Sequence, residues 1–343
     1  MLMRLLALLV IAGVAASAAM YHWVEGQMLA PGAERPEPVL ITVASGASLR
    51  AALTDLEKAG LLADSETTYY WARVKEKTAI RSGTYRFTGG ESAAELLRVL
   101  NVGRVITERL TIPEGLNRWQ IRELMVREGW MDAESFDRLC DDESLLQAHA
   151  IPAKSCEGFL FPETYTLARG LLPQKIFSLL YQTYRSQFDQ LVQGGGGPLE
   201  LGELEFVTLA SIVEKETGAV HERPRIACVF YNRLRAKPAW RLETDPTVIY
   251  AATLEDPNFD GNIKRYHLRK MDNPYNTYKN FGLPPGPIAS PGLAALRAVR
   301  SPSDCADFFF VSKNNGEHIF CPTLGCHNRA VQTWQVEYFR KKR

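Results

Sequence analysis

Residues 205–217 carry the most regular helical spacing of hydrophobic positions in the chain. A helix over this stretch places a set of apolar side chains on one face: Phe206, Leu209, Ala210, Val213 and Val220. Lys215 is then expected to project to the opposite side, into solvent. Glu214 lies at the margin of the apolar stripe and does not face Glu216, because residues two apart on a helix point in different directions.

The carboxyl of Glu216 falls inside this stripe, next to Val213 and Ile212 on the same helical face. Burial among aliphatic side chains disfavours a charged carboxylate, so the pattern predicts a raised pKa for Glu216. A carboxyl that keeps its proton near neutral pH is suited to general acid catalysis. The alternative is structural, with Glu216 at the end of the helix and paired with Arg223 or Arg225.

Hydrophobic positions at the amino terminus are continuous instead of periodic. The apolar run that starts at Leu5 extends to about Val24, close to the ~20 residues that span a bilayer. Tyr21 and Trp23 suit the membrane interface, and Arg4 favours a cytoplasmic amino terminus. A cleaved signal peptide is the alternative, since residues 16–18 (ASA) can serve as a cleavage site, but the run is long for one. We therefore predict an uncleaved anchor over residues 1–24 and export of the remainder.

The next segments alternate between strand and helix patterns. Residues 25–38 are rich in proline and predict a semi-rigid spacer that holds the following unit off the membrane. Residues 39–112 form a small α+β unit, with strands predicted over 39–43, 82–87 and 105–112 and helices over 49–56, 66–75 and 92–100. Ser92 and Glu95 have the spacing of a capping box. On pattern alone, this unit is equally a spacer or a glycan-binding module.

Residues 113–343 predict a larger mixed α+β domain. Its helical patterns cover 119–126, 133–139, 173–191, 225–234 and 327–339. Residues 308–311 and 317–320 predict a hairpin across the Asn-Gly turn. The long loops rich in Tyr, Asn, Gly and Pro over 275–292 are typical of segments that line a site.

Composition narrows the function classes. A hydrophobic fraction of 46%, a charged fraction of 23% and a net charge of +1 are typical of a folded protein with no strong field for nucleic acid. Cys228 lies in an apolar helical pattern and is predicted to be a buried small hydrophobic residue. Cys321 and Cys326 are close enough to bridge, but their spacing with His318 and His327 fits no structural zinc pattern, so no metal is expected.

A series of motifs then occurs in a fixed order: EGFLFPETY at 157–165, LASIVEKET at 209–217, FYNRL at 230–234, TDPTVIY at 244–250, YNTY at 275–278, GLPPG at 282–286, and HIF, T and HN between 318 and 328. Together they strongly resemble the endolytic murein transglycosylase (YceG-like) family. The resemblance covers nearly the whole chain and is most specific between Glu157 and Asn328.

The resemblance implies a single-pass protein of the bacterial inner membrane with a periplasmic catalytic region and a LysM-like subdomain at 39–112. It implies internal cleavage of nascent peptidoglycan strands between N-acetylmuramic acid and N-acetylglucosamine, leaving 1,6-anhydro ends and ending glycan elongation. Glycan-polymerising synthases are implied neighbours, and no cofactor is needed. The catalytic residue by similarity is Glu216, which the helical face indicates independently.

Supporting roles are assigned to residues of the same motifs. Sugar contacts are expected from Asn232, Tyr275, Asn276 and Tyr278, support of Glu216 from Glu214 and Thr217, and placement of a donor from Asp245. Glu243 departs from the family pattern, which has Gln at this position. A carboxylate there would raise the pKa of Glu216 further or supply a second base.

Two other functions remain to be distinguished. One is a catalytically silent, membrane-tethered glycan-binding scaffold, whose cellular role would survive Glu216→Gln. The other is a pyridoxal-phosphate-dependent lyase, which needs a Schiff-base lysine and a phosphate cradle. Lys215 is predicted to point away from the apolar face, and no glycine-rich cradle precedes a helix, so the lyase is disfavoured.

Overall fold

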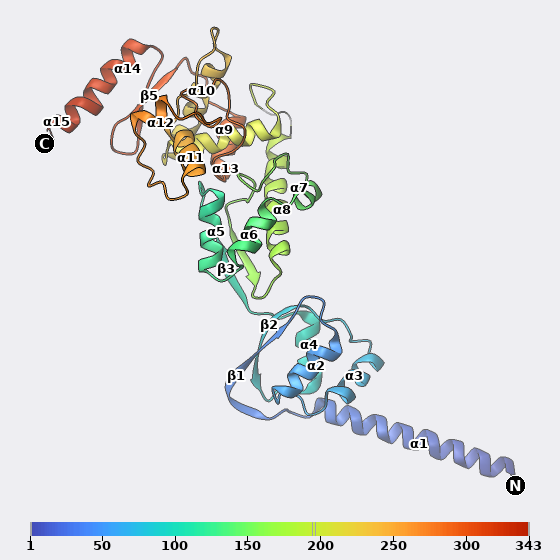
Figure 1. Ribbon diagram of the computed structural model, residues 1–343. Coiled ribbons are helices and arrows are strands. Elements are labelled where there is room, and N and C mark those ends of the chain that lie inside the picture. Colours follow the sequence, from blue (N-terminus) through green and yellow to red (C-terminus); the bar gives the residue numbers. More distant parts are fainter. Residues whose placement is uncertain (1, 194, 196, 342–343) are drawn as a thin grey trace. The chain divides into compact units, whose positions relative to one another are not determined.

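The computed structural model describes residues 2–193, 195 and 197–341 (Figure 1). The chain divides into two compact units. The first contains Met1–Leu110 and Tyr165–Leu172, and the second contains Thr111–Thr164 and Pro173–Arg343. The chain passes between the units along strands β3 (Thr107–Thr111) and β4 (Thr164–Ala168), which pair with each other.

The first unit follows the strand and helix order expected from the sequence. Its elements are β1 (Glu34–Val43), α2 (Leu49–Lys58), α3 (Ser65–Val74), β2 (Gly83–Gly89) and α4 (Ala93–Val102). Strands β1 and β2 are antiparallel, and the helices pack around a core that includes Leu53, Leu56, Tyr85 and Phe87. The predicted capping box is confirmed, because Ser92 and Glu95 exchange hydrogen bonds at the start of α4.

Helix α1 (Leu2–Leu29) is the apolar amino-terminal helix, and its segment Leu8–Leu29 is long and apolar enough to cross a membrane. Its last turns belong to the first unit: Met28 is buried in the core, and Val24 packs against it. Lys75 Nζ lies 2.6 Å from Glu25 Oε1 and 2.6 Å from the Tyr21 hydroxyl. The helix is thereby fastened to α3 by packing and by an ion pair.

The expected spacer over residues 25–38 is wrong for most of its length. Residues up to Leu29 continue α1, and β1 already begins at Glu34. Proline is tolerated here because β1 lies at the edge of a two-stranded sheet, where one side of the strand has no partner for a backbone N–H.

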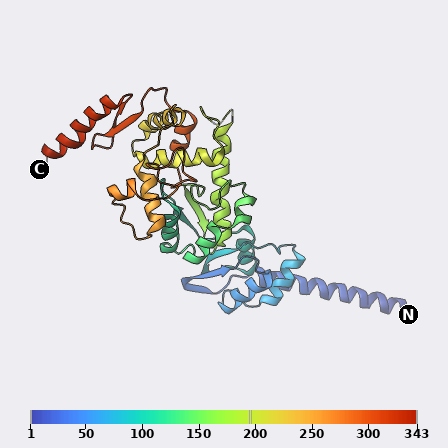
Figure 2. The ribbon, with the colours of Figure 1, turned by 45° about the horizontal axis from the view of Figure 1, so that its top comes forward.

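The second unit is mainly helical. Its first helices are α5 (Arg118–Arg127), α6 (Ala133–Cys140), α7 (Glu143–Ala148) and α8 (Pro173–Val192). They are followed along the chain by α9 (Glu203–Glu216), α10 (Arg223–Arg235), α11 (Asp245–Glu255), α12 (Arg265–Arg269) and α13 (Leu293–Arg300). Helix α9 packs against α10, α11 and α13, which makes it the central helix of this unit (Figures 1 and 2). Aromatic side chains of α8, among them Tyr184 and Phe188, join this core to Phe206 of α9.

The carboxyl-terminal segment contains the predicted hairpin. Strands β5 (Phe309–Ser312) and β6 (His318–Cys321) pair in antiparallel register, with Phe310 opposite Phe320. The predicted closing helix is divided into α14 (Leu324–Val331), a π-helical segment at Gln332–Glu337 and α15 (Tyr338–Lys341).

Cysteine pairing corrects one prediction. Cys228 is buried as expected, but it forms a disulfide with Cys305 and is not a free hydrophobic side chain. Further disulfides join Cys140 to Cys156 and Cys321 to Cys326. The sulfurs of Cys321 and Cys326 are thus bonded to each other and not free to bind a metal.

Candidate active site

Helix α9 places Glu216 at its carboxyl-terminal end. At the start of the helix, the Glu205 side chain accepts a hydrogen bond from the Gly202 N–H at 3.0 Å. The helix ends at Glu216, because the backbone of Thr217 is extended. Side chains on the predicted face, among them Leu209 and Val213, are fully buried. Val220 is an exception: it is 56% exposed, because the helix ends before the pattern does.

The Glu216 carboxyl is held by a neutral donor. The Thr244 hydroxyl donates a hydrogen bond to Glu216 Oε1. Burial, chiefly, raises the pKa of Glu216 to about 7; the nearby Asp245 charge also raises it, while the Thr244 hydrogen bond and the Arg233 charge act in the opposite direction. Such a carboxyl exists in both protonation states at neutral pH, so it can donate a proton and then take one up.

Neither arginine proposed as a structural partner pairs with Glu216. Arg223 donates to Glu214 Oε1 at 2.5 Å in a buried ion pair, and Arg225 donates to Asp307 at 2.8 Å. Within the described residues, Glu216 forms no salt bridge. The raised pKa of Glu216 therefore follows from burial without a compensating cation in contact.

The segment that carries Thr244 is fixed by the loop at 275–278. Thr277 Oγ1 accepts a hydrogen bond from the Thr244 N–H at 3.1 Å, and the Thr277 carbonyl accepts one from the Glu243 N–H at 3.2 Å. The Tyr278 hydroxyl donates to Asp245 Oδ1 at 2.7 Å. These bonds bring the TDPT and YNTY motifs together beside the end of α9.

Glu243 and Arg233 are two further charged residues near the Glu216 carboxyl. Glu243 has a φ of 47°, in the left-handed region that side chains other than glycine rarely adopt. Its charge acts on Arg233 and Tyr278, whereas the carboxylate that raises the pKa of Glu216 is Asp245. Arg233 is buried and donates through Nε to the Phe308 carbonyl at 2.8 Å.

Sequence analysis assigned no role to Thr244 or to Arg233, which both lie at this site. Both lie in quoted motifs, Arg233 in FYNRL and Thr244 at the start of TDPTVIY. The signal that the sequence offered for Thr244 was its hydroxyl, one position before the predicted site residue Asp245. No signal within the chain indicated that Arg233 lies near Glu216.

Several expected supporting residues have other partners. Glu214 bonds to Arg223 and to the Gly292 N–H, and the Thr217 hydroxyl contacts Glu222 and Ala219. The Asn232 amide donates to the carbonyls of Cys305 and Asp307. The Asn276 amide is fully buried and donates to the carbonyls of His267 and Met271. These contacts fix helix ends and loops around the site.

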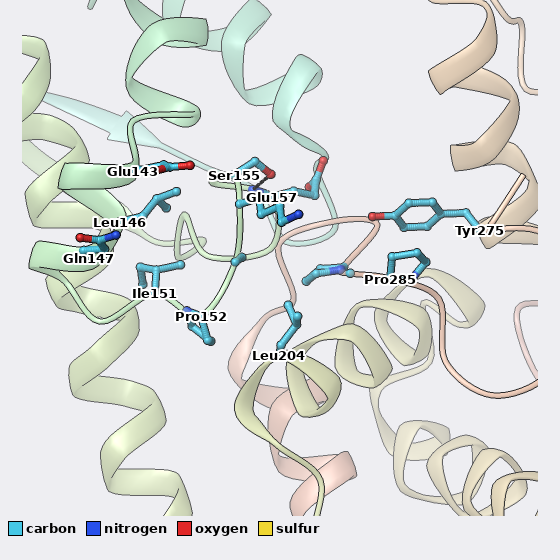
Figure 3. Close-up of a pocket in the computed structure, with 14 residues that line it drawn as sticks. Glu143, Leu146, Gln147, Ile151, Pro152, Ser155, Glu157, Leu204, Tyr275 and Pro285 are labelled. Carbon is cyan, nitrogen blue, oxygen red and sulfur yellow. Dashed lines mark hydrogen bonds between the residues drawn. The ribbon is translucent and has the colours of Figure 1, made fainter.

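Tyr275 lines a cavity of about 700 Å³ together with Ser155, Glu157 and Pro285 (Figure 3). The Tyr275 hydroxyl points into it from the side opposite Gln147. Glu157 is buried, and this burial raises the pKa of its carboxyl to about 7, as for Glu216. It accepts hydrogen bonds from the Arg118 N–H and the Tyr250 hydroxyl, both at 3.1 Å, so its Oε2 is engaged by the fold.

Comparison with known proteins identifies similar chains. A model of the YceG-like family matches residues 41–333. A protein of Bacillus subtilis (strain 168) named endolytic murein transglycosylase is 28% identical over 321 residues, covering 86% of this chain and 84% of that protein. One of the same name from Streptococcus pneumoniae (strain ATCC BAA-255 / R6) is 29% identical over 358 residues, covering 91% of this chain and 61% of the relative.

A crystal structure of a YceG-like protein from Listeria monocytogenes shares this fold. The TM-score is 0.56 at 26% identity, and the match covers 86% of this chain and 99% of the crystallised one. The prediction of a mixed α+β fold with an apolar amino-terminal helix is confirmed.

Proposed function

Because the chain belongs to the YceG-like family, we propose that it is a lytic transglycosylase of peptidoglycan and that Glu216 is its catalytic acid and base. The observation that carries the proposal is the partly buried Glu216 carboxyl, whose pKa is raised to about 7 and which has no cation in contact among the described residues. The names of the relatives, endolytic murein transglycosylase, support peptidoglycan as the substrate.

A single carboxyl suffices for this reaction. Protonated Glu216 donates its proton to the oxygen between N-acetylmuramic acid and N-acetylglucosamine, and the glucosamine alcohol leaves through an oxocarbenium-like state. The resulting carboxylate then accepts the proton of the muramic acid C6 hydroxyl, whose oxygen bonds to C1. The product is a 1,6-anhydro end, and the proton balance of Glu216 is restored.

The Thr244 hydrogen bond gives the two carboxyl oxygens different roles. Because Oε1 accepts the hydrogen bond from the Thr244 hydroxyl, Oε2 is the oxygen that carries the acidic proton toward the substrate. Asp245, held by the Tyr278 hydroxyl, keeps a negative charge nearby that favours the protonated form of Glu216. Neither residue needs to touch the scissile bond.

The position of the enzyme in the cell is part of the proposal. Helix α1 serves as a single-pass anchor of the inner membrane, with the amino terminus in the cytoplasm and the remainder in the periplasm. The strand–helix–helix–strand order of the first unit suits a LysM-like module that binds glycan, followed by a catalytic region over residues 113–343. Cleavage of nascent strands near glycan-polymerising synthases would then end their elongation.

Mass spectrometry of the products tests the reaction. The full chain in detergent micelles is incubated with un-cross-linked glycan strands, beside Glu216→Gln and, as a matched control, Glu134→Gln, which changes an exposed glutamate of α6. We expect anhydro-muramic ends from the parent and the control and none from Glu216→Gln. Reducing ends would indicate a hydrolase, with Glu243 as the next candidate base. Binding without cleavage by any of them would indicate the non-catalytic scaffold.

A further inference from the structure

A cavity of about 770 Å³ lies beside the segment that holds Glu216. Its walls combine aromatic rings with charge: Trp240, Phe281, Phe309, Lys237, Arg241 and Glu243. We call this cavity the Trp240 groove. None of its wall residues has a role in the proton transfers described above.

The groove adjoins the catalytic carboxyl through consecutive residues. Glu243 forms part of its wall, and the next residue, Thr244, donates its hydroxyl to Glu216. Arg233 also connects the two places, since its guanidinium lies 5.8 Å from the centre of the Phe309 ring and its charge acts on Glu216. A sugar chain whose scissile bond reaches Glu216 therefore has this groove as its neighbour.

The aromatic wall is held in place by its own packing. The Trp240 ring packs against Phe308 at 5.2 Å and Phe309 at 5.4 Å between ring centres, yet 37% of the residue remains exposed. Phe281 is 56% exposed. Exposed rings that are fixed at the side of a cavity offer the flat apolar surface on which the C–H face of a pyranose ring can stack.

The charged wall holds two cations, Arg241 and Lys237, against the one carboxylate of Glu243, so its net charge favours an anion. The Arg241 guanidinium lies 4.4 Å from the centre of the Phe281 ring, and its Nε donates to the Lys279 carbonyl at 3.1 Å. Stacking and this hydrogen bond orient the group while its other N–H donors stay available. Lys237 adds a second cation to the same cavity. A ligand that presents a sugar ring and carboxylates complements both walls.

We propose that the Trp240 groove binds the N-acetylmuramic acid beside the cleaved bond. Its ring stacks on Trp240, and the carboxylates of its peptide stem face Arg241 and Lys237. This inference rests on the proposed function, and it names stem-bearing glycan as the preferred form of the substrate. Arg241 then acts as a specificity residue and Trp240 as a binding residue, and neither takes part in proton transfer.

Binding to an inactive chain tests the groove separately from catalysis. The full-length Glu216→Gln chain in detergent micelles is titrated with glycan strands, either bearing their peptide stems or stripped of them by an amidase. Adding Trp240→Ala should weaken binding of both strands about tenfold, the scale of one lost aromatic contact. Adding Arg241→Gln should weaken the binding of stem-bearing strands more than that of stripped strands, because the stripped strands keep only the lactyl carboxylate of each muramic acid.

Controls separate local from general effects. Phe281→Ala changes an exposed ring of the same groove and should weaken binding severalfold without the folding risk of Trp240→Ala, whereas Tyr266→Ala changes a ring that is 62% exposed outside the groove and should have no effect. Unchanged affinity in both Trp240→Ala and Phe281→Ala would overturn the groove and leave the proposed function intact. No binding of either strand by the Glu216→Gln chain would overturn both.

Discussion

The Thr244 hydroxyl donates a hydrogen bond to Oε1 of Glu216, across 28 positions of sequence. A neutral donor fixes the carboxyl without forcing it to stay ionised, which an arginine or lysine in contact would do. The same bond lowers the pKa of Glu216, against the larger effect of burial. One hydroxyl therefore affects both the orientation of the Glu216 carboxyl and its pKa.

Thr244→Val removes this hydrogen bond and keeps the side chain's shape. Because the bond favours the carboxylate, its loss should raise the pKa of Glu216 above about 7 and shift the alkaline fall of the pH–rate profile to higher pH. The maximal rate should drop about tenfold because the carboxyl is less well oriented. Thr253→Val, which alters a hydroxyl bonded to the Ile249 carbonyl within α11, is the control. A profile that falls at unchanged pH would contradict the assigned role.

Asp245→Asn should shift the same profile in the opposite direction. The Asp245 charge raises the pKa of Glu216, so a neutral amide lowers it, and activity should be lost at lower pH than in the parent. The amide oxygen can still accept the bond from the Tyr278 hydroxyl, so the local geometry is kept. Measurement of kcat against pH in the two variants checks both signs, and shifts in the same direction would show that Glu216 is not the titrating group.

Glu157→Gln should change how stability depends on pH. Burial raises the pKa of Glu157 from 4.5 to about 7, so the folded state binds this proton more tightly than the unfolded chain. The free energy of unfolding that this tighter proton binding contributes is fully present below pH 4.5 and is lost as pH rises through about 7. The total loss is about 3 kcal/mol. Glutamine does not titrate, so relative to the parent the variant should gain stability between pH 5 and pH 8.

Denaturant unfolding at these two pH values measures the effect of Glu157→Gln. Glu163→Gln, an exposed neighbour in the same motif, should leave the pH dependence as in the parent. Glu216 contributes a slope of the same sign, so part of the dependence should remain in Glu157→Gln. An unchanged slope would mean that Glu157 titrates alike in the folded and unfolded chain.

The disulfides should contribute unequally to stability. Cys228 and Cys305 are 77 positions apart, and Cys321 and Cys326 only 5. Loop-closure entropy predicts losses of about 4.5 and about 2 kcal/mol respectively when each pair is replaced by serines. Thermal unfolding of the two double variants checks the order. Equal losses would indicate that unfolded-chain entropy does not govern these bridges.

The sequence predicted what depends on local periodicity. The face of α9, the capping box at Ser92, and the hairpin of β5 and β6 follow from spacing within one or two elements. The raised pKa of Glu216 could also be foreseen, because desolvation was already implied by the apolar stripe around it.

Contacts between distant segments could not be predicted in this way. The bond of Thr244 to Glu216 and the Cys228–Cys305 bridge depend on how helices α9 and α10 pack with the loops after them. Asn232 resembled a sugar-contacting residue by type, yet its amide holds the backbone at Cys305 and Asp307. A polar side chain in a motif can serve loop geometry as readily as a ligand, and only its partners distinguish the two.

Helix α1 continues into the first unit without a break, and this limits where that unit can lie. Val24 and Met28 are committed to its core, so in the proposed orientation the bilayer must end before them. In that orientation no flexible linker separates the lipid headgroups from the first unit. The first unit would then lie at the membrane surface, and the glycan that it could reach would be the portion of a strand nearest the lipid.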